Sequence, residues 1–172
     1  MKILFTFFTF LVLSISNAQS KKESMINDWS RAKAFTIEYL EAMPESSYDI
    51  KPNDEVRSFA SQMLHLSDAI YGFVGMATNT PSDFSPGALE SSGDVLKSSV
   101  IMKVANAYDF GISAIQSFDE NQLGEMFTLF GQFQMSREQA IRKCFEHQTH
   151  HRGQTAVYLR MAGVTPPSMK LF

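Results

Sequence analysis

Histidine is the residue type in this sequence whose number and spacing could hold a metal ion. His147 and His151 are four residues apart in a stretch with helical character, so about 40° separates their directions around the helix axis. Two imidazoles at this spacing can converge on one ion, which for zinc requires nitrogen atoms at about 2.0–2.1 Å. His150 is offset from the centre of this face by about 80° and is therefore the weaker candidate.

A third ligand must come from another part of the chain, and His65 is the remaining histidine. It lies nearly opposite the main apolar stripe of its predicted helix, among the small residues Ser58, Ser61, Ala69 and Gly72. Small side chains leave space for a pocket, but they would also allow close helix contact in a dimer. Three histidines with an open fourth position are typical of catalytic zinc, and imidazole also suits nickel, iron and copper. The alternative is that these are surface histidines, or buried ones whose hydrogen bonds are satisfied.

Three polar residues near His151 could assist such a site. Arg152 and Gln154 could hold a substrate anion or orient a ligand through its second ring nitrogen. Tyr158 shares the histidine stripe and could donate a proton, although a core tyrosine with one polar contact is the alternative. We therefore name Arg152, Gln154 and Tyr158 as second-layer or substrate-contacting candidates, and no catalytic residue is assigned.

Two further residue types bear on the site. Cys144 precedes His147 by three residues and could be a soft ligand, although a free cysteine is more often a small buried hydrophobe. The acidic residues show no paired-carboxylate pattern that converges on the histidines. The residue after His147 is Gln148 rather than the glutamate of the HExxH zinc proteases, which excludes that class.

Helical periodicity predicts the elements that must position these residues. Four helices are expected at about residues 23–43, 55–76, 93–118 and 137–161. The second would be capped by Asn53 or Asp54 and the fourth by Ser136. Residues 119–135 are ambiguous between an extended packing segment and a short helix. Four long helices with one core predict an all-α fold, a four-helix bundle.

Composition limits the class of protein. Hydrophobic residues make up 44% and charged residues 19%, which excludes general disorder. The net charge of −3 argues against a nucleic-acid partner, and a single cysteine excludes an intrachain disulfide.

The first 18 residues have the layout of a secretory signal peptide. Lys2 precedes an apolar run of 13 residues, and Ser16-Asn17-Ala18 offers a cleavage site before Gln19. An uncleaved anchor is the alternative, but the run is shorter than the roughly 20 residues that a membrane span needs. We therefore expect residues 1–18 to be removed and residues 19–172 to form one exported domain, periplasmic or extracellular, without a stable membrane span.

The sequence also resembles a known family, the DinB/YfiT-like proteins. The resemblance rests on the run HQTHHRGQ at residues 147–154, followed by YLR at 158–160, Gly163 and the two prolines at 166–167, and upstream on IKP at 50–52, VRS at 56–58 and His65. It covers essentially all of residues 19–172 and implies a four-helix bundle of up-down-down-up course, often a homodimer. It also implies a divalent metal ion, zinc or nickel, bound by His65, His147 and His151.

What the resemblance implies about activity is broader. Some relatives are metal-dependent transferases or isomerases that use low-molecular-weight thiols. Export argues against a thiol cosubstrate, because such thiols belong to reducing compartments. We therefore expect a metal-dependent transferase or hydrolase that acts on a small molecule. The alternatives are a non-catalytic dimeric bundle with a structural or vestigial metal pocket, and a module that binds an apolar ligand.

Overall fold

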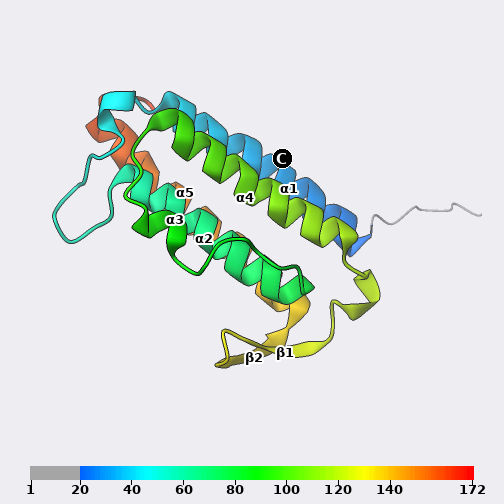
Figure 1. Ribbon diagram of the computed structural model, residues 1–172. Helices are drawn as coiled ribbons and strands as arrows, with labels where there is room; N and C mark the ends of the chain where they lie inside the picture. Colours follow the sequence, from blue (N-terminus) through cyan, green and yellow to red (C-terminus); the bar gives the residue numbers. More distant parts are fainter. Residues whose placement is uncertain (1–19) are drawn as a thin grey trace, which may run out of the picture.

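Four long helices pack side by side in the computed structural model, which describes residues 20–172 (Figure 1). They are α1 (Lys21–Ala42), α2 (Phe59–Thr78), α4 (Lys97–Ser117) and α5 (Arg137–Met161). The shorter elements are the 3₁₀ helices η1 (Glu45–Ser47) and η2 (Glu120–Gln122), the one-turn helix α3 (Ala88–Ser91) and the strands β1 (Met126–Leu129) and β2 (Phe133–Ser136). The predicted leader at residues 1–18 lies outside the described residues.

The helices follow an up-down-down-up course. In Figure 1, α1 and α5 run in one direction and α2 and α4 in the other. Helix α2 packs against both α4 and α5, and α1 closes the bundle against the same two helices. The prediction of an all-α four-helix bundle is therefore confirmed. None of the helices formed by residues 20–172 combines the length and the apolar character that crossing a membrane requires.

Serine side chains fix the start of three of the long helices. The hydroxyl groups of Ser20 and Ser58 accept hydrogen bonds from backbone N–H groups three residues further on, in the first turns of α1 and α2. Ser136 forms a reciprocal capping box with Gln139 at the start of α5, as its sequence position predicts. Each cap satisfies an N–H group that the helix itself leaves without a partner.

Helix α2 begins later than the sequence predicts, at Phe59 rather than near residue 55. The N–H groups of Phe59 and Ala60 donate to the backbone oxygens of Ile50 and Tyr48, at 3.1 and 2.9 Å. These bonds satisfy the first donors of the helix while residues 53–57 form a loop that is exposed at 53–55, so Ser58 is the cap and Asn53 and Asp54 are not.

The other end of α2 also differs from the prediction, because the helix extends two residues beyond residue 76. The helix continues to Thr78, and Asn79 ends it in the left-handed conformation (φ 55°). A Cβ atom on residue 75 would lie 2.9 Å from the backbone oxygen of Thr80. Gly75 therefore permits the close return of the chain and does not break the helix.

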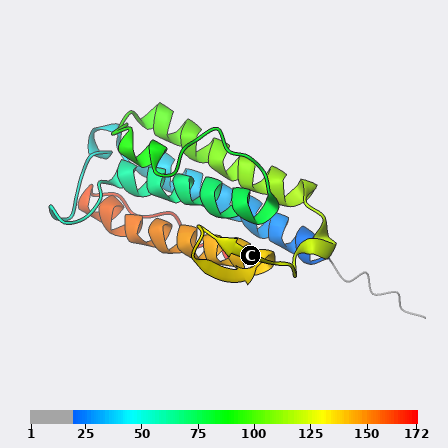
Figure 2. The same cartoon turned by 60° about the horizontal axis from the view of Figure 1, so that its bottom comes forward.

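Two more segments are settled by the structure. Helix α4 begins at Lys97 rather than near Gly93, after a turn in which the Leu96 N–H donates to the Asp94 carboxylate at 3.0 Å. The ambiguous residues 119–135 contain η2 and most of an antiparallel hairpin of β1 and β2, which lies beside the start of α5 (Figure 2). Three residues, 130–132, connect the strands, and the Gln132 N–H donates to the Leu129 backbone oxygen at 3.1 Å. Phe130 and Gly131, at the centre of this turn, have positive φ angles of 52° and 70°.

Candidate metal centre

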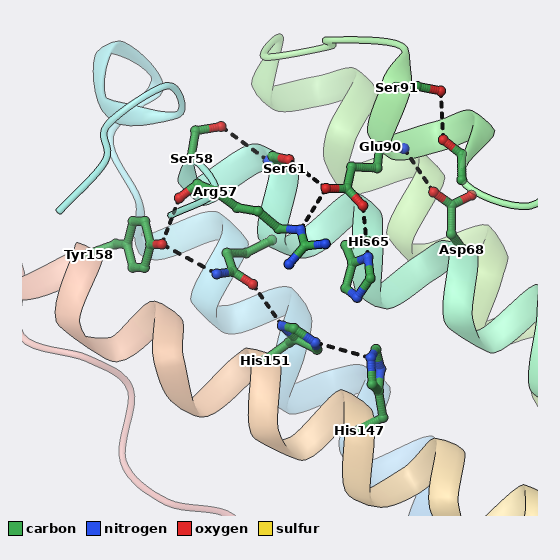
Figure 3. A network of polar contacts seen from close by, with 12 residues as sticks. Arg57, Ser58, Ser61, His65, Asp68, Glu90, Ser91, His147, His151 and Tyr158 are labelled. Atoms are coloured by element: carbon green, nitrogen blue, oxygen red, sulfur yellow. Dashed lines mark hydrogen bonds and ion pairs between the residues drawn. The ribbon is translucent and has the colours of Figure 1, made fainter. Parts of the chain in front are cut away.

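The three histidines that the sequence selects meet between α2 and α5 (Figure 3). His65 comes from α2, and His147 and His151 come from successive turns of α5. One ring nitrogen from each residue lies within 4.8 Å of the other two. The ring centroids are 4.3 Å apart for His147 and His151, and 4.6 Å apart for His65 and His151. Such a group could hold a metal ion.

His147 and His151 face each other through their Nε2 atoms. Their Nε2 atoms are 3.1 Å apart, close to the roughly 3.3 Å that separates two ligands of a tetrahedral zinc ion. The Phe73 ring stacks on the His147 ring at a centroid distance of 6.1 Å. The Nδ1 atom of His147 is buried without a hydrogen-bond partner in residues 20–172. The hydrogen bonds of the protein alone therefore do not satisfy both nitrogens of this ring.

A chain of hydrogen bonds sets the orientation and tautomer of His151. Its Nδ1 lies 2.7 Å from the side-chain oxygen of Gln62, an acceptor, so Nδ1 carries the proton. The amide nitrogen of Gln62 donates to the hydroxyl of Tyr158 at 3.4 Å, and that hydroxyl donates to the backbone oxygen of Arg57 at 2.7 Å. Every donor in the chain meets an acceptor, which leaves the lone pair of His151 Nε2 directed at the other histidines.

The Glu90 carboxylate sets the orientation and tautomer of His65. The Nδ1 atom of His65 donates to Glu90 Oε2 at 2.7 Å, so its Nε2 is the ligand nitrogen. Glu90 belongs to the one-turn helix α3, and the Asp68 carboxylate accepts the N–H groups of Leu89 and Glu90 at 3.1 and 2.8 Å. A carboxylate behind a metal-binding histidine fixes the ring and strengthens it as a ligand.

Electrostatics keeps the site in the state that binds metal. Burial and the neighbouring imidazoles lower the pKa of His147 to about 4 and that of His151 to about 3, so both are neutral at pH 7. Burial opposes ionisation of Glu90, but hydrogen bonds from Arg57 and His65 outweigh it and lower the pKa of this carboxyl. Neutral imidazoles are the form that coordinates a metal, so the residues fit a divalent ion.

The structure brings some of the other predicted residues to this site. Tyr158 supports His151 through Gln62, and Gln154 bonds the exposed His150 at 3.1 Å while its own side-chain oxygen is buried without a partner in residues 20–172. Neither Gln154 nor His150 belongs to the group of three histidines.

Arg152 and Cys144 lie elsewhere. The Arg152 guanidinium is buried against α1, where it donates to Thr36 at 3.1 Å and to Gln148 at 2.8 Å and covers the Phe35 ring. Cys144 is fully buried, its thiol directed to the Ala69 backbone oxygen, and burial raises the pKa of that thiol. Cys144 is therefore a small buried hydrophobic residue, the alternative to a metal ligand that the sequence suggests.

Sequence reasoning missed two supporting residues, Gln62 and Glu90. Gln62 was within reach, since it precedes His65 by three residues and shares its side of α2. Glu90 gave no periodic signal, because it lies in an isolated turn of helix 25 residues beyond His65.

A polar cleft of about 720 Å³ adjoins the group of three histidines at His151, the one of the three that lines it. Its inner wall includes Arg57, Ser61, Gln62, Glu90, His151 and Gln154, and exposed residues of the loop before α2 form its rim. Three protein ligands next to an open cleft leave room for a further ligand from solution.

The chain matches the DinB family over residues 17–172, which confirms the resemblance. Its structure is similar to that of a DinB-like protein from Bacillus cereus ATCC 10987, with a TM-score of 0.76 and 18% identity over 86% of this chain and 97% of that one. A DinB-like protein from Bacillus subtilis has a TM-score of 0.68, also at 18% identity, over 85% of this chain and 96% of that one. No curated protein matches the chain. The family match covers nearly all of the described residues, and the chain therefore belongs to the DinB family.

Proposed function

We propose that the protein binds one divalent ion, zinc or nickel, through His65, His147 and His151, and uses it in a transferase or hydrolase reaction on a small molecule. The observation that carries the proposal is the convergence of three imidazoles from two helices beside an open cleft. Structural zinc sites are closed by four protein ligands, whereas catalytic sites keep one position for water or substrate.

The chemistry of a bound ion would be that of a Lewis acid, which polarises a carbonyl or lowers the pKa of a water molecule. The residues of the chain would supply the rest. Glu90 and Gln62 hold two imidazoles in the ligand tautomer, Phe73 covers one side of His147, and the cleft admits the substrate.

The compartment and the assembly are part of the same proposal. Cleavage after Ala18 would deliver residues 19–172 as one domain to the periplasm or the outside of the cell, where we expect a homodimer. Support for export comes from the layout of residues 1–18 and from the single cysteine.

The first experiment measures metal content. Residues 19–172 are purified from the exported fraction, and bound metals are counted by mass spectrometry in the wild type and in His65→Ala and His147→Ala. We expect about one ion per wild-type chain and its loss in both variants. His150→Ala is the matched control, because it removes an exposed imidazole on α5 outside the group, and it should keep the ion. Wild-type stoichiometry in both test variants would overturn the site.

A second experiment separates a catalytic ion from a stabilising one. Hydrolysis of p-nitrophenyl acetate is followed before and after chelation by dipicolinate and after zinc is restored. A catalytic ion predicts loss and recovery of turnover. A structural ion predicts instead that the metal-loaded protein shows no turnover and that chelation lowers its melting temperature strongly.

A further inference from the structure

We propose that Arg57 binds a carboxylate group of the substrate at the inner end of the polar cleft, beside the three histidines. The substrate class is then a small carboxylic acid whose reactive group lies a few ångströms from its carboxylate. The reaction on this acid rests on the proposed function, whereas the anion site is defined by residues of the chain alone.

Hydrogen bonds hold Arg57 in place but leave its two terminal nitrogens able to donate to a ligand. Its Nε donates to Glu90 Oε1 at 2.6 Å, and its backbone oxygen accepts the Tyr158 hydroxyl at 2.7 Å. Its two terminal nitrogens donate no hydrogen bond to any of residues 20–172 within the distance and angle limits of such a bond, and the side chain is 39% exposed. A guanidinium fixed through one edge presents its other edge as a two-pronged donor, which matches a planar carboxylate.

The position of Arg57 relies on the same carboxylate that supports the metal centre. Glu90 accepts from Arg57 through Oε1 and from His65 through Oε2. In Figure 3 the guanidinium lies beside the Glu90 carboxylate and next to the His65 ring. One small molecule can therefore contact Arg57 and approach the ring nitrogens together.

The charge balance of the site favours an anion. Imidazoles that coordinate a metal are in their neutral form, so with a divalent ion bound the positive charges of the ion and of Arg57 would exceed the negative charge of Glu90. Asp68 is occupied by the backbone of α3. Asp49 and Glu55 also line the cleft, but on its exposed rim, where water screens them.

The backbone indicates a carboxylate rather than a phosphate. Phosphate sites at helix starts depend on free N–H groups. At the start of α2, the N–H groups of Phe59 and Ala60 bind the 48–50 segment, and those of Ser61 and Gln62 bind Ser58. Arg57 is left as the one cationic donor on the inner wall.

The test compares two probes of similar size, succinate and succinamate, which differ by one carboxylate. Binding is measured by calorimetry on the cobalt-loaded protein. We expect succinate to bind about 10-fold more tightly to the wild type, as a charge-assisted two-pronged contact implies. Arg57→Gln should reduce this preference to less than about 2-fold. Lys51→Gln is the matched control, since it removes the rim cation of the same cleft, and it should keep the preference.

Three results would overturn the proposal: no preference in the wild type, a preference retained in Arg57→Gln, or a preference lost in Lys51→Gln alone. The cobalt absorption spectrum shows whether Arg57→Gln keeps the three-histidine site. If it does not, Arg57→Lys, which keeps the charge without the planar fork, is expected to retain the cobalt spectrum and part of the preference.

A metal-free arm separates this proposal from the proposed function. Succinate binding to metal-free wild type and Arg57→Gln is followed by NMR chemical shifts. Weaker binding that still depends on Arg57 supports the anion site even if no ion is ever bound. Binding that is equal in both proteins, or absent from both, overturns the anion site whatever the metal measurements show.

Discussion

Glu90 Oε2 lies 2.7 Å from His65 Nδ1, so a single turn of helix between α2 and α4 controls one of the three converging imidazoles. Its other oxygen accepts from Arg57 and, at 3.4 Å, from Ser61. The short helix α3 is thus a structural support of the site, and its contribution can be measured.

Glu90→Gln should weaken metal binding about 10-fold to 100-fold, because a neutral amide is a poorer partner for the imidazole N–H. The dissociation constant is measured by competition with a coloured chelator. Glu41→Gln, which changes an exposed carboxylate on α1, is the control and should leave the affinity unchanged. Equal affinity in Glu90→Gln would show that the carboxylate does not act on the ligand.

Gln62→Leu should also weaken metal binding, by about 10-fold, because His151 Nδ1 then loses its acceptor and the tautomer is no longer fixed. Tyr158→Phe should have a smaller effect, since it leaves the contact between Gln62 and His151 in place and removes only the hydroxyl's bonds to Gln62 and to the Arg57 backbone oxygen. Zinc calorimetry on both variants gives the comparison. A larger loss of zinc affinity in Tyr158→Phe than in Gln62→Leu would contradict the order of the hydrogen-bond chain, in which Gln62 contacts His151 and Tyr158 contacts Gln62.

Gly153→Ala should raise the free energy of unfolding by roughly 0.5–1 kcal/mol. Gly153 lies within α5, and a Cβ atom there would meet no atom within 4 Å. Gly111→Ala is the matched comparison and should destabilise the protein, because its Cβ would lie 3.0 Å from Ile70 Cγ2 and 3.5 Å from the Trp29 ring. Urea unfolding measures both, and a loss of stability in Gly153→Ala would reveal a contact that the monomer lacks.

Asp94→Asn should lower the free energy of unfolding at pH 7 by about 1 kcal/mol, discounted for solvent screening. Hydrogen bonds from Lys103 and Ser99 lower the pKa of Asp94 from 3.8 to about 2. A carboxyl with a lowered pKa stabilises the folded state fully above its ordinary value, and this contribution is lost as pH falls toward 2.

The difference between wild type and Asp94→Asn should therefore shrink between pH 4 and pH 2, as followed by unfolding at several pH values. Asp109→Asn breaks an exposed ion pair with Lys33 and is expected to change stability by less than about 0.5 kcal/mol. A difference for Asp94→Asn that stays constant down to pH 2 would contradict the assignment.

The sequence predicted the bundle and the three histidines because both depend on helical periodicity. The spacing of His147 and His151 is a local property of one helix. The position of His65 was readable as a polar residue away from the apolar stripe of its own helix. The hairpin had no comparable signal, since its two strands of four residues pair only with each other.

The supporting contacts depend on packing between elements, which a single sequence does not display. Arg152 follows His151 directly, and this adjacency suggested a role in the site. One residue corresponds to about 100° of rotation, which directs its guanidinium to Thr36 on α1 instead. Gln62 reaches His151 because α2 and α5 are in contact, and Glu90 reaches His65 because Asp68 anchors α3.

The division of the three histidines between α2 and α5 has a consequence for assembly. An unpacked α5 offers only two of the three converging imidazoles, those of His147 and His151, and His65 joins them when that helix docks on α2. An ion that requires all three can be captured only after α2 and α5 have docked, so its uptake would follow that step of folding. In a refolding experiment, the appearance of the cobalt spectrum would accordingly time the docking of these two helices.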